Sequence, residues 1–429
     1  MKLEQNPKKS LHELDKKSGG REITGLNPKL ENFSRLEIGT DIEIEKKNTE
    51  IVSSQNLDSQ YMFVNPTNGE IERLVEAPHW RAITSNLIHS SWRDGDDNNH
   101  FYYTANIKGS GYLKNSLLNI KNKMLDDYEH WNRNDDEGLP DAFGLGCKQD
   151  FIPADGDIIT KSKWLTSNGL RTELYSSYGK LKNIYFKGEK KSITEMRSEN
   201  IIPNQKEFVP YIGMRLLKSN TRIAEVKEHE PNISRDLFKD AFNVYNQEIH
   251  DSNLSIPEIV FGDPESEIQF FNTFAERMGN NLAVLQNLGI IGWYMHSSNI
   301  TLAAEIVDIG PYLNYAEMTP DHTLQLELIN GIRRGIWKDF RDITYGLRYL
   351  VKAGQSCGMT VPDKHVFVNK VINGFHDMLD DSELVTMQLK RDDLERALFQ
   401  VLNTHIIHKQ RLEPLRETVS PLHWDLLDN

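Results

Sequence analysis

Residues 285–312 read LQNLGIIGWYMHSSNITLAAEIVDIGPY and contain the strongest functional signal in the chain. A polar loop ends at Asn299, and Glu305–Ile309 then predicts a short buried strand that carries Asp308 near its end. Magnesium prefers hard oxygen ligands, commonly one or two carboxylates completed by phosphates and water. Asn299 and Asp308 therefore predict a metal site. The alternative is that both residues only cap turns, which is the commoner role when spacing is the only evidence.

This pairing of an amide with a carboxylate is typical of phosphoryl and nucleotidyl transfer. Such reactions need a cation on the phosphates, one or two metal ions, and ligands that hold those ions. Protein kinases use a catalytic-loop Asn and a DFG Asp, which stand in the same relation as Asn299 and Asp308.

A wider match extends the kinase pattern. Residues 285–312 resemble the selenoprotein O family of kinase-fold protein adenylyltransferases, with the same spacing from Asn to Asp and the same Gly-Pro-Tyr after the Asp. The resemblance implies an α+β, two-lobed, kinase-like fold with a mostly helical C-lobe. It also implies that Asn299 and Asp308 bind Mg²⁺ or Mn²⁺, that ATP is the nucleotide, and that AMP is transferred to a hydroxyl of a protein or small molecule.

Two further segments match the family in the same order along the chain. Ile107-Lys108-Gly109-Ser110-Gly111 is similar to the family segment whose Lys contacts the nucleotide phosphates. Lys206-Glu207-Phe208-Val209 resembles a family helix whose Glu would pair with Lys108. Without the resemblance, a turn with a solvent-exposed lysine is the commoner explanation of an isolated Lys-Gly-x-Gly such as that at Lys108.

Phosphate-binding residues follow from two weaker matches. Pro231-x-x-x-Arg235 is similar to a family segment that supplies a phosphate-binding Arg, so the resemblance implies that role for Arg235. Asn168-Gly169-x-Arg171 resembles the family's Asp-Gly-Arg, which implies that Asn168, Gly169 and Arg171 contact the nucleotide.

One departure from the family concerns the catalytic base. The family has an Asp directly before its metal-binding Asn, where this chain has Ser298. Histidine as a residue type titrates near neutrality, so His296 is a candidate substitute base, although a structural role is commoner for such a His. Two rival functions therefore stand beside adenylyl transfer. One is a catalytically inactive, pseudokinase-like protein that binds nucleotide or a partner, and the other is γ-phosphoryl transfer.

The rest of the chain suggests three regions. Residues 1–60 are polar and predict a partly disordered arm. Residues 61–225 predict an N-lobe-like α+β region with insertions at 122–160 and 178–203, and residues 226–429 a mostly helical C-lobe.

Two secondary-structure signals are clear within these regions. Residues 101–107 are aromatic and β-branched, which predicts a strand running into a glycine turn. Asp263-Pro264 predicts a helix start, and apolar residues at steps of three and four continue to a C-cap at Gly289.

Composition limits the partners. The formal net charge is −13 and basic runs are short, so general nucleic-acid binding is not expected. The longest apolar run is too short to cross a bilayer, and the N-terminus has no apolar signal segment. Two cysteines without regular spacing favour a reducing, cytoplasmic location over a disulfide framework.

Overall fold

The structure is a computed structural model. It describes residues 33–64, 82–85, 88–109, 145–153, 156–186, 189–199, 209–228, 231–291, 295–310, 312–314, 339, 342–344 and 346–379. The chain forms two compact units, with Glu173–Thr221 joining the N-terminal residues up to Trp164, and Leu165–Thr172 joining the residues from Arg222 onward. Helices and strands both contribute, so the mixed α+β class predicted from the sequence is confirmed.

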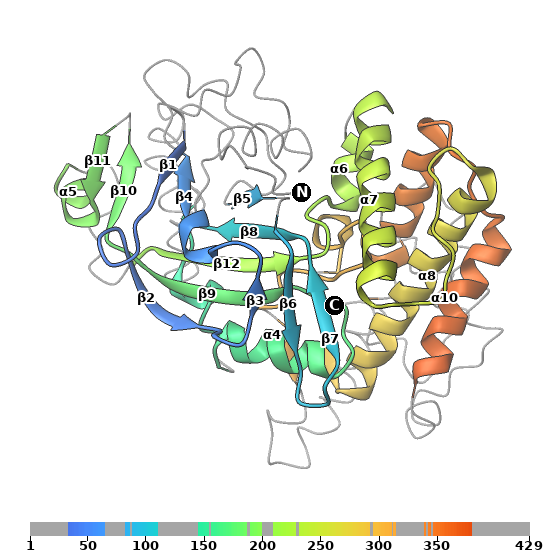
Figure 1. Cartoon of the computed structure of the whole chain (residues 1–429), viewed down its shortest axis with the longest axis horizontal. Coiled ribbons are helices and arrows are strands. Elements are labelled where there is room, and N and C mark those ends of the chain that lie inside the picture. The colour runs from blue at the N-terminus through green and yellow to red at the C-terminus, as the bar shows by residue number, and fades with distance from the viewer. Residues whose placement is uncertain are drawn as a thin grey trace, which may run out of the picture. The chain divides into compact units, whose positions relative to one another are not determined.

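A five-stranded sheet forms the centre of the first unit, and all its neighbouring strands are antiparallel (Figure 1). Across the sheet the order is β2 (Ile42–Lys47), β9 (Leu174–Leu181), β12 (Tyr211–Leu217), β8 (Thr104–Lys108) and β5 (Ala82–Ser85). Every residue of the middle strand β12 is buried. In register, Lys108 at the end of β8 pairs with Gly213 of β12.

Smaller elements complete this unit. The short strands are β1 (Phe33–Arg35) with β4 (Met62–Val64), β3 (Val52–Ser53) with β6 (Ser90–Arg93) and β7 (Asn99–Tyr102), and β10 (Asn183–Phe186) with β11 (Glu189–Ser192). The helices are η2 (Leu57–Gln60), η6 (Lys148–Asp150), most of α4 (Ile158–Ser167) and α5 (Ile193–Ser198). The hydroxyl of Ser162 on α4 accepts a hydrogen bond from the backbone N–H of Tyr175 on β9 at 3.1 Å, which fixes α4 against the sheet.

Of the segment 1–60, which was expected to be a partly disordered arm, residues 1–32 lie outside the described residues, and residues 33–60 form strands and a short helix. In β2, Ile42 is buried and Ile44 is half-buried, whereas Glu43 and Glu45 are exposed. This alternation is that of an edge strand with one face on the core. The high charge of the segment hides the pattern when only composition is considered.

The two expected insertions also contribute to the core. In the first, 122–160, Leu145, Cys147 and Phe151 are buried, and Phe151 stacks on Tyr178 with ring centroids 5.8 Å apart. The second, 178–203, begins inside β9, which pairs with both β2 and β12. The parts of these segments that the structure describes are therefore integral to the first unit.

The strand expected at residues 101–107 is present but interrupted. β7 ends at Tyr102, and β8 begins at Thr104. Between them, Tyr103 donates its backbone N–H to the carbonyl of Leu217 at 2.9 Å. Gly109 follows with a φ of +91°, and a Cβ there would lie 2.5 Å from the carbonyl oxygen of Tyr211, so only glycine fits this turn.

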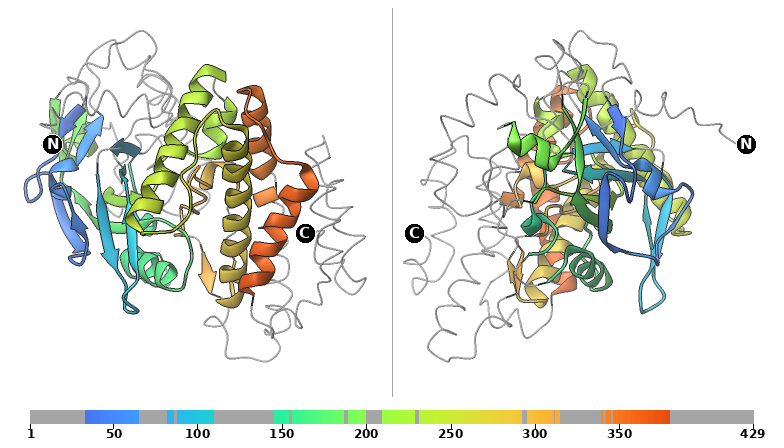
Figure 2. Two further views of the ribbon diagram at one scale, coloured as in Figure 1. Left: turned by 45° about the vertical axis from the view of Figure 1, so that its right-hand side comes forward. Right: turned by 90° about the vertical axis from the view of Figure 1, so that its left-hand side faces the viewer.

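The second unit is mostly helical. Its elements are α6 (Ile223–Glu228), α7 (Pro231–Asp251), α8 (Pro264–Asn287), the strand pair β13 (Ile290–Ile291) and β14 (Leu313–Asn314), η7 (Ser297–Asn299) and α10 (Lys364–Met378). Residues 346–356 are also helical. Helices α7, α8 and α10 lie side by side in both Figure 1 and Figure 2. No helix in the described ranges is long and apolar enough to cross a membrane.

Helix α8 confirms the sequence prediction in detail. Asp263 caps it by accepting from the N–H of Ser266 at 2.9 Å, and Pro264 is its first residue. The apolar stripe is buried, and Gly289 just beyond the end has a φ of +64°. Phenylalanine rings of α7 and α8 pack together in this core, where Phe242 stacks on Phe270 at 4.8 Å.

Gly279 allows α8 and α10 to approach closely. A Cβ at this position would lie 2.1 Å from the carbonyl oxygen of Val371 and 2.8 Å from the backbone nitrogen of Phe375. Backbone atoms cannot move aside cheaply, so we expect Gly279→Ala to lower the free energy of unfolding by about 1–3 kcal/mol despite alanine's better helix propensity. Urea denaturation measures this. Gly310→Ala is the matched control, because a Cβ there meets nothing within 4 Å. Equal stability of both variants would contradict the close approach.

Candidate functional site

A tight hairpin in the second unit brings Asn299 and Asp308 together. Ile300 and Ile306 form an antiparallel bridge, and the N–H of Val307 donates to the carbonyl of Asn299 at 3.0 Å. Asp308 follows Val307 directly. The hairpin therefore explains how two residues with eight others between them have neighbouring side chains.

Thr301 closes the turn of this hairpin. Its Oγ1 donates to Glu305 Oε2 at 3.0 Å and accepts from the backbone N–H of Glu305 at 3.2 Å. Ala304 completes the turn in the left-handed region, with a φ of +59°. These local bonds fix the turn, and therefore the two ends that carry Asn299 and Asp308.

The prediction of a strand at Glu305–Ile309 is wrong. Ile306 makes only isolated bridges, to Ile300 and to Thr172, and no ladder forms. Asp308 has a φ of +60°, which ends any extended run. Aspartate tolerates this left-handed conformation better than most residues, because its short polar side chain can bond locally. The carboxylate remains partly accessible, with 27% of its side chain exposed.

Arg222, at the start of the second unit, contacts both predicted metal ligands. Its Nη1 donates to Asn299 Oδ1 at 3.0 Å and lies 3.5 Å from Asp308 Oδ2. The same nitrogen donates to the backbone carbonyl of Ser298. The Arg222 side chain is completely buried. The two oxygens thus converge on one cationic group, and that group is a guanidinium.

The backbone around Arg222 is joined to the hairpin. Arg222 forms an antiparallel bridge with Thr301, and the N–H of Ile223 donates to the carbonyl of Ile300 at 3.0 Å. On the other side, the N–H of Ile306 donates to the carbonyl of Arg171 at 2.9 Å. The hairpin is therefore held between two segments that are distant in sequence.

The oxygens of Asn299 and Asp308 are suitable ligands for a divalent cation, but in this structure both contact the Arg222 guanidinium. One carboxylate and one amide oxygen fit Mg²⁺ when phosphates and water supply the remaining ligands. In the part of the chain that the structure describes, no group of three or more His, Cys, Asp or Glu side chains could hold a metal. A metal ion between Asn299 and Asp308 would therefore depend on nucleotide oxygens and would require Arg222 to move.

The catalytic-base candidate lies beside this site in sequence. His296 is exposed and precedes η7, where it makes no side-chain capping bond. Ser298, the residue directly before Asn299, contributes its backbone carbonyl to Arg222. No carboxylate stands directly before Asn299.

Lys108, in the first unit, pairs with a residue that the sequence did not single out. Its Nζ lies 3.0 Å from Asp150 Oδ1, and both side chains are nearly buried. Asp150 belongs to η6, and its Oδ2 accepts from the backbone N–H of Cys147 at 2.8 Å. Glu207, the expected partner of Lys108, lies outside the described residues. The sequence signal for Asp150 is weak, because it consists of apolar residues such as Leu145 and Cys147 within an otherwise polar segment.

Cys147 is not a nucleophile in this arrangement. Burial and then the neighbouring Asp150 carboxylate raise the pKa of its thiol to about 12. The thiolate is the reactive form, so this cysteine stays protonated near neutral pH.

Arg171 has structural partners. Its guanidinium forms a two-bonded pair with Glu248, at 2.5 and 2.7 Å, and its Nε donates to the carbonyl of Ala303 at 2.5 Å. Asn168 and Gly169 precede it in an exposed turn, where Gly169 has a φ of +88°. The three residues are close in sequence, but the guanidinium is directed into the ion pair.

Arg235, which is expected to bind phosphate together with Lys108, is exposed on α7. Its guanidinium carbon lies 5.3 Å from the centre of the Phe261 ring, which is within the range of a cation–π interaction. An exposed guanidinium remains accessible to an anion.

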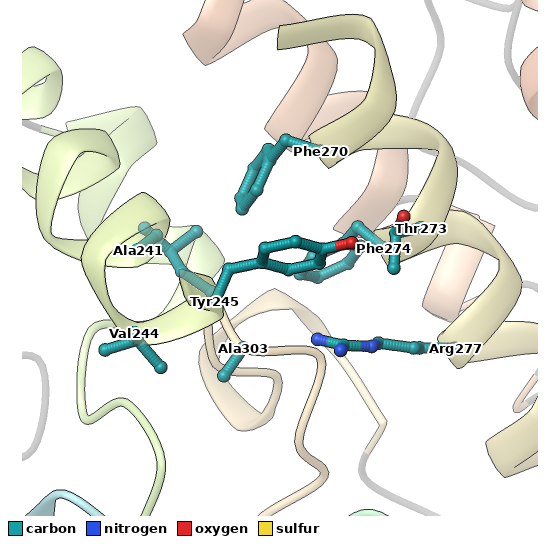
Figure 3. Close-up of a pocket in the computed structure, with 9 residues that line it drawn as sticks. Ala241, Val244, Tyr245, Phe270, Thr273, Phe274, Arg277 and Ala303 are labelled. Carbon is teal, nitrogen blue, oxygen red and sulfur yellow. The ribbon is translucent and has the colours of Figure 1, made fainter. Parts of the chain in front are cut away.

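A small cavity lies between α7, α8 and the hairpin (Figure 3). Arg277 lies over the Tyr245 ring, 5.1 Å from its centre, and its Nη2 is 3.0 Å from Glu248 Oε2. Burial and then the nearby Arg171 lower the pKa of Arg277. The cavity volume of about 10 Å³ holds at most a single water molecule, so it is not a nucleotide site.

Comparison with known proteins adds no assignment, since no family model and no curated protein matches this chain.

Proposed function

We propose that this protein is a nucleotide-dependent transferase with a two-lobed, kinase-like fold, and that it moves AMP from Mg-ATP to a hydroxyl of a protein or small-molecule acceptor. The observation that supports it is the convergence of Asn299 Oδ1 and Asp308 Oδ2 on one cation position. In this proposal the two residues hold Mg²⁺ or Mn²⁺, which neutralises charge on the phosphates. The requirement for ATP and the two widely spaced cysteines favour a cytoplasmic location.

The remaining roles follow the sequence resemblance. Lys108 and Arg235 bind phosphates, and Asn168, Gly169 and Arg171 are secondary candidates for nucleotide contact. The acceptor oxygen attacks the α-phosphorus, the bond from that phosphorus to the bridging oxygen breaks, and pyrophosphate leaves. His296 is the candidate that takes the acceptor's proton. Glu207 is the proposed second partner of Lys108.

A second candidate function is nucleotide or partner binding without turnover. Arg222 occupies the cation position, and Ser298 replaces the expected acid, so both features favour a site that does not react. A third candidate, γ-phosphoryl transfer, differs only in which phosphorus is attacked.

Two labelled forms of ATP separate these functions. Purified protein, Mg²⁺ and a cell lysate are incubated with ATP labelled at either the α- or the γ-phosphate, and label in macromolecules is counted. We expect label from the α position only, and none when EDTA removes the metal. Label from the γ position alone would indicate a kinase. No label from either, with ATP bound, would favour the inactive protein, and absence of ATP binding would contradict every function that uses a nucleotide.

A further inference from the structure

The Arg222 guanidinium stands where a divalent cation would stand. It is completely buried, and one of its nitrogens contacts the side-chain oxygen of Asn299, the carboxylate of Asp308 and the carbonyl of Ser298. Three oxygens therefore surround one nitrogen, and one of them belongs to a carboxylate. The arginine neutralises this carboxylate without a metal ion.

The position of Arg222 is fixed by the same hairpin that carries its acceptors. Its backbone bridges Thr301, and the next residue donates to the carbonyl of Ile300. The guanidinium is therefore presented to Asn299 and Asp308 at a high local concentration. A free metal ion must compete with a cation that is already tethered in place.

The two cations cannot share these oxygens. A divalent ion bound to Asp308 Oδ2 and Asn299 Oδ1 would lie within a few ångströms of the guanidinium, where like charges repel strongly. Each oxygen would also lose its hydrogen bond from Arg222. Binding of the metal therefore requires that Arg222 leave.

We propose that Arg222 is a resident counter-cation that competes with the divalent ion for Asn299 and Asp308. The proposal rests on the function above, in which these two residues are the metal ligands. Metal alone then binds weakly. A metal–triphosphate complex binds better, because its phosphate oxygens give the displaced guanidinium a new anionic partner.

Electron paramagnetic resonance of free Mn²⁺ tests the competition without any measurement of activity. Mn²⁺ is titrated into the full-length protein and into Arg222→Gln, which removes the charge but keeps a hydrogen-bond donor. We expect Arg222→Gln to bind Mn²⁺ at least about 10-fold more tightly than the unmodified chain. Arg222→Gln combined with Asp308→Asn should lose this gain. Lys239→Gln is the matched control, because it removes one positive charge from an exposed site on α7.

Arg222→Lys covers the case in which the glutamine variant does not fold. It keeps the buried charge, but a lysine ammonium lacks the planar set of N–H donors of a guanidinium. We therefore expect a smaller gain in Mn²⁺ affinity than for Arg222→Gln. Circular dichroism establishes which variants fold. A gain in every folded Arg222 variant no larger than that of Lys239→Gln overturns the proposal. A gain in Mn²⁺ affinity without transfer of label from ATP supports the competition and contradicts the proposed transferase. Transfer of label without a gain in Mn²⁺ affinity supports the transferase and overturns the competition.

Discussion

Asp308→Asn is expected to lower the rate of adenylyl transfer by at least about 100-fold, because of the two protein ligands proposed for the metal ion Asp308 is the charged one. Asparagine is the appropriate replacement. Asp308 has a φ of +60°, a conformation that asparagine also tolerates, whereas alanine would add backbone strain to the loss of charge. The loss should therefore appear in activity while the hairpin stays folded.

Asp236→Asn is the matched control for this variant. Asp236 is an exposed carboxylate on α7 in the same unit, paired with Lys239 at 3.5 Å. The same chemical change there should leave the rate within about twofold of the unmodified chain. Initial rates with α-labelled ATP measure both variants, and thermal unfolding monitors their folding. Full transfer by Asp308→Asn would exclude this carboxylate from the reaction.

Glu173→Gln is expected to lower the free energy of unfolding by about 3–5 kcal/mol. Glu173 Oε2 lies 2.6 Å from Arg215 Nη1, and the two side chains are 0% and 2% exposed. Arg215 Nε also donates to Asn106 Oδ1 at 2.7 Å, so the guanidinium is fixed within the sheet. Removing the carboxylate's charge leaves a buried positive charge without its compensation.

A surface pair in the same unit provides the comparison. Lys182 and Glu43 lie 3.2 Å apart, but their side chains are 44% and 56% exposed. Water and salt screen such pairs, so Glu43→Gln should cost no more than about 1 kcal/mol. Urea denaturation followed by fluorescence measures both variants. Similar values for the two would show that the Glu173–Arg215 pair contributes no more than an exposed one.

The sequence predicted those features whose geometry is determined by residues close together in the chain. Helix α8 follows from its Asp263 cap and its apolar spacing, and both act within a few turns. The proximity of Asn299 and Asp308 also arises within one short hairpin. Their spacing, together with the wider resemblance of residues 285–312, therefore predicted a shared site, although the residues between them form a turn and not a strand.

The observed contacts of Lys108 and Arg222 with distant segments were not predicted, because such contacts have no periodicity in the sequence. Lys108 meets Asp150 from a segment expected to be a surface insertion. Arg222 meets Asn299 across 77 positions. A side chain's partner over such distances is set by how the segments pack. The β2 strand was missed for another reason, because its charged exposed face dominates its composition.

We propose that Asn299 and Asp308 form a cation site for a nucleotide-bound metal ion. Crystals grown with Mn²⁺ and a non-hydrolysable ATP analogue test it by anomalous scattering. We expect a manganese peak about 2.1 Å from both Asn299 Oδ1 and Asp308 Oδ2, with the Arg222 guanidinium displaced toward the phosphates. A bound nucleotide with Arg222 still on both oxygens, and manganese elsewhere or absent, would contradict it.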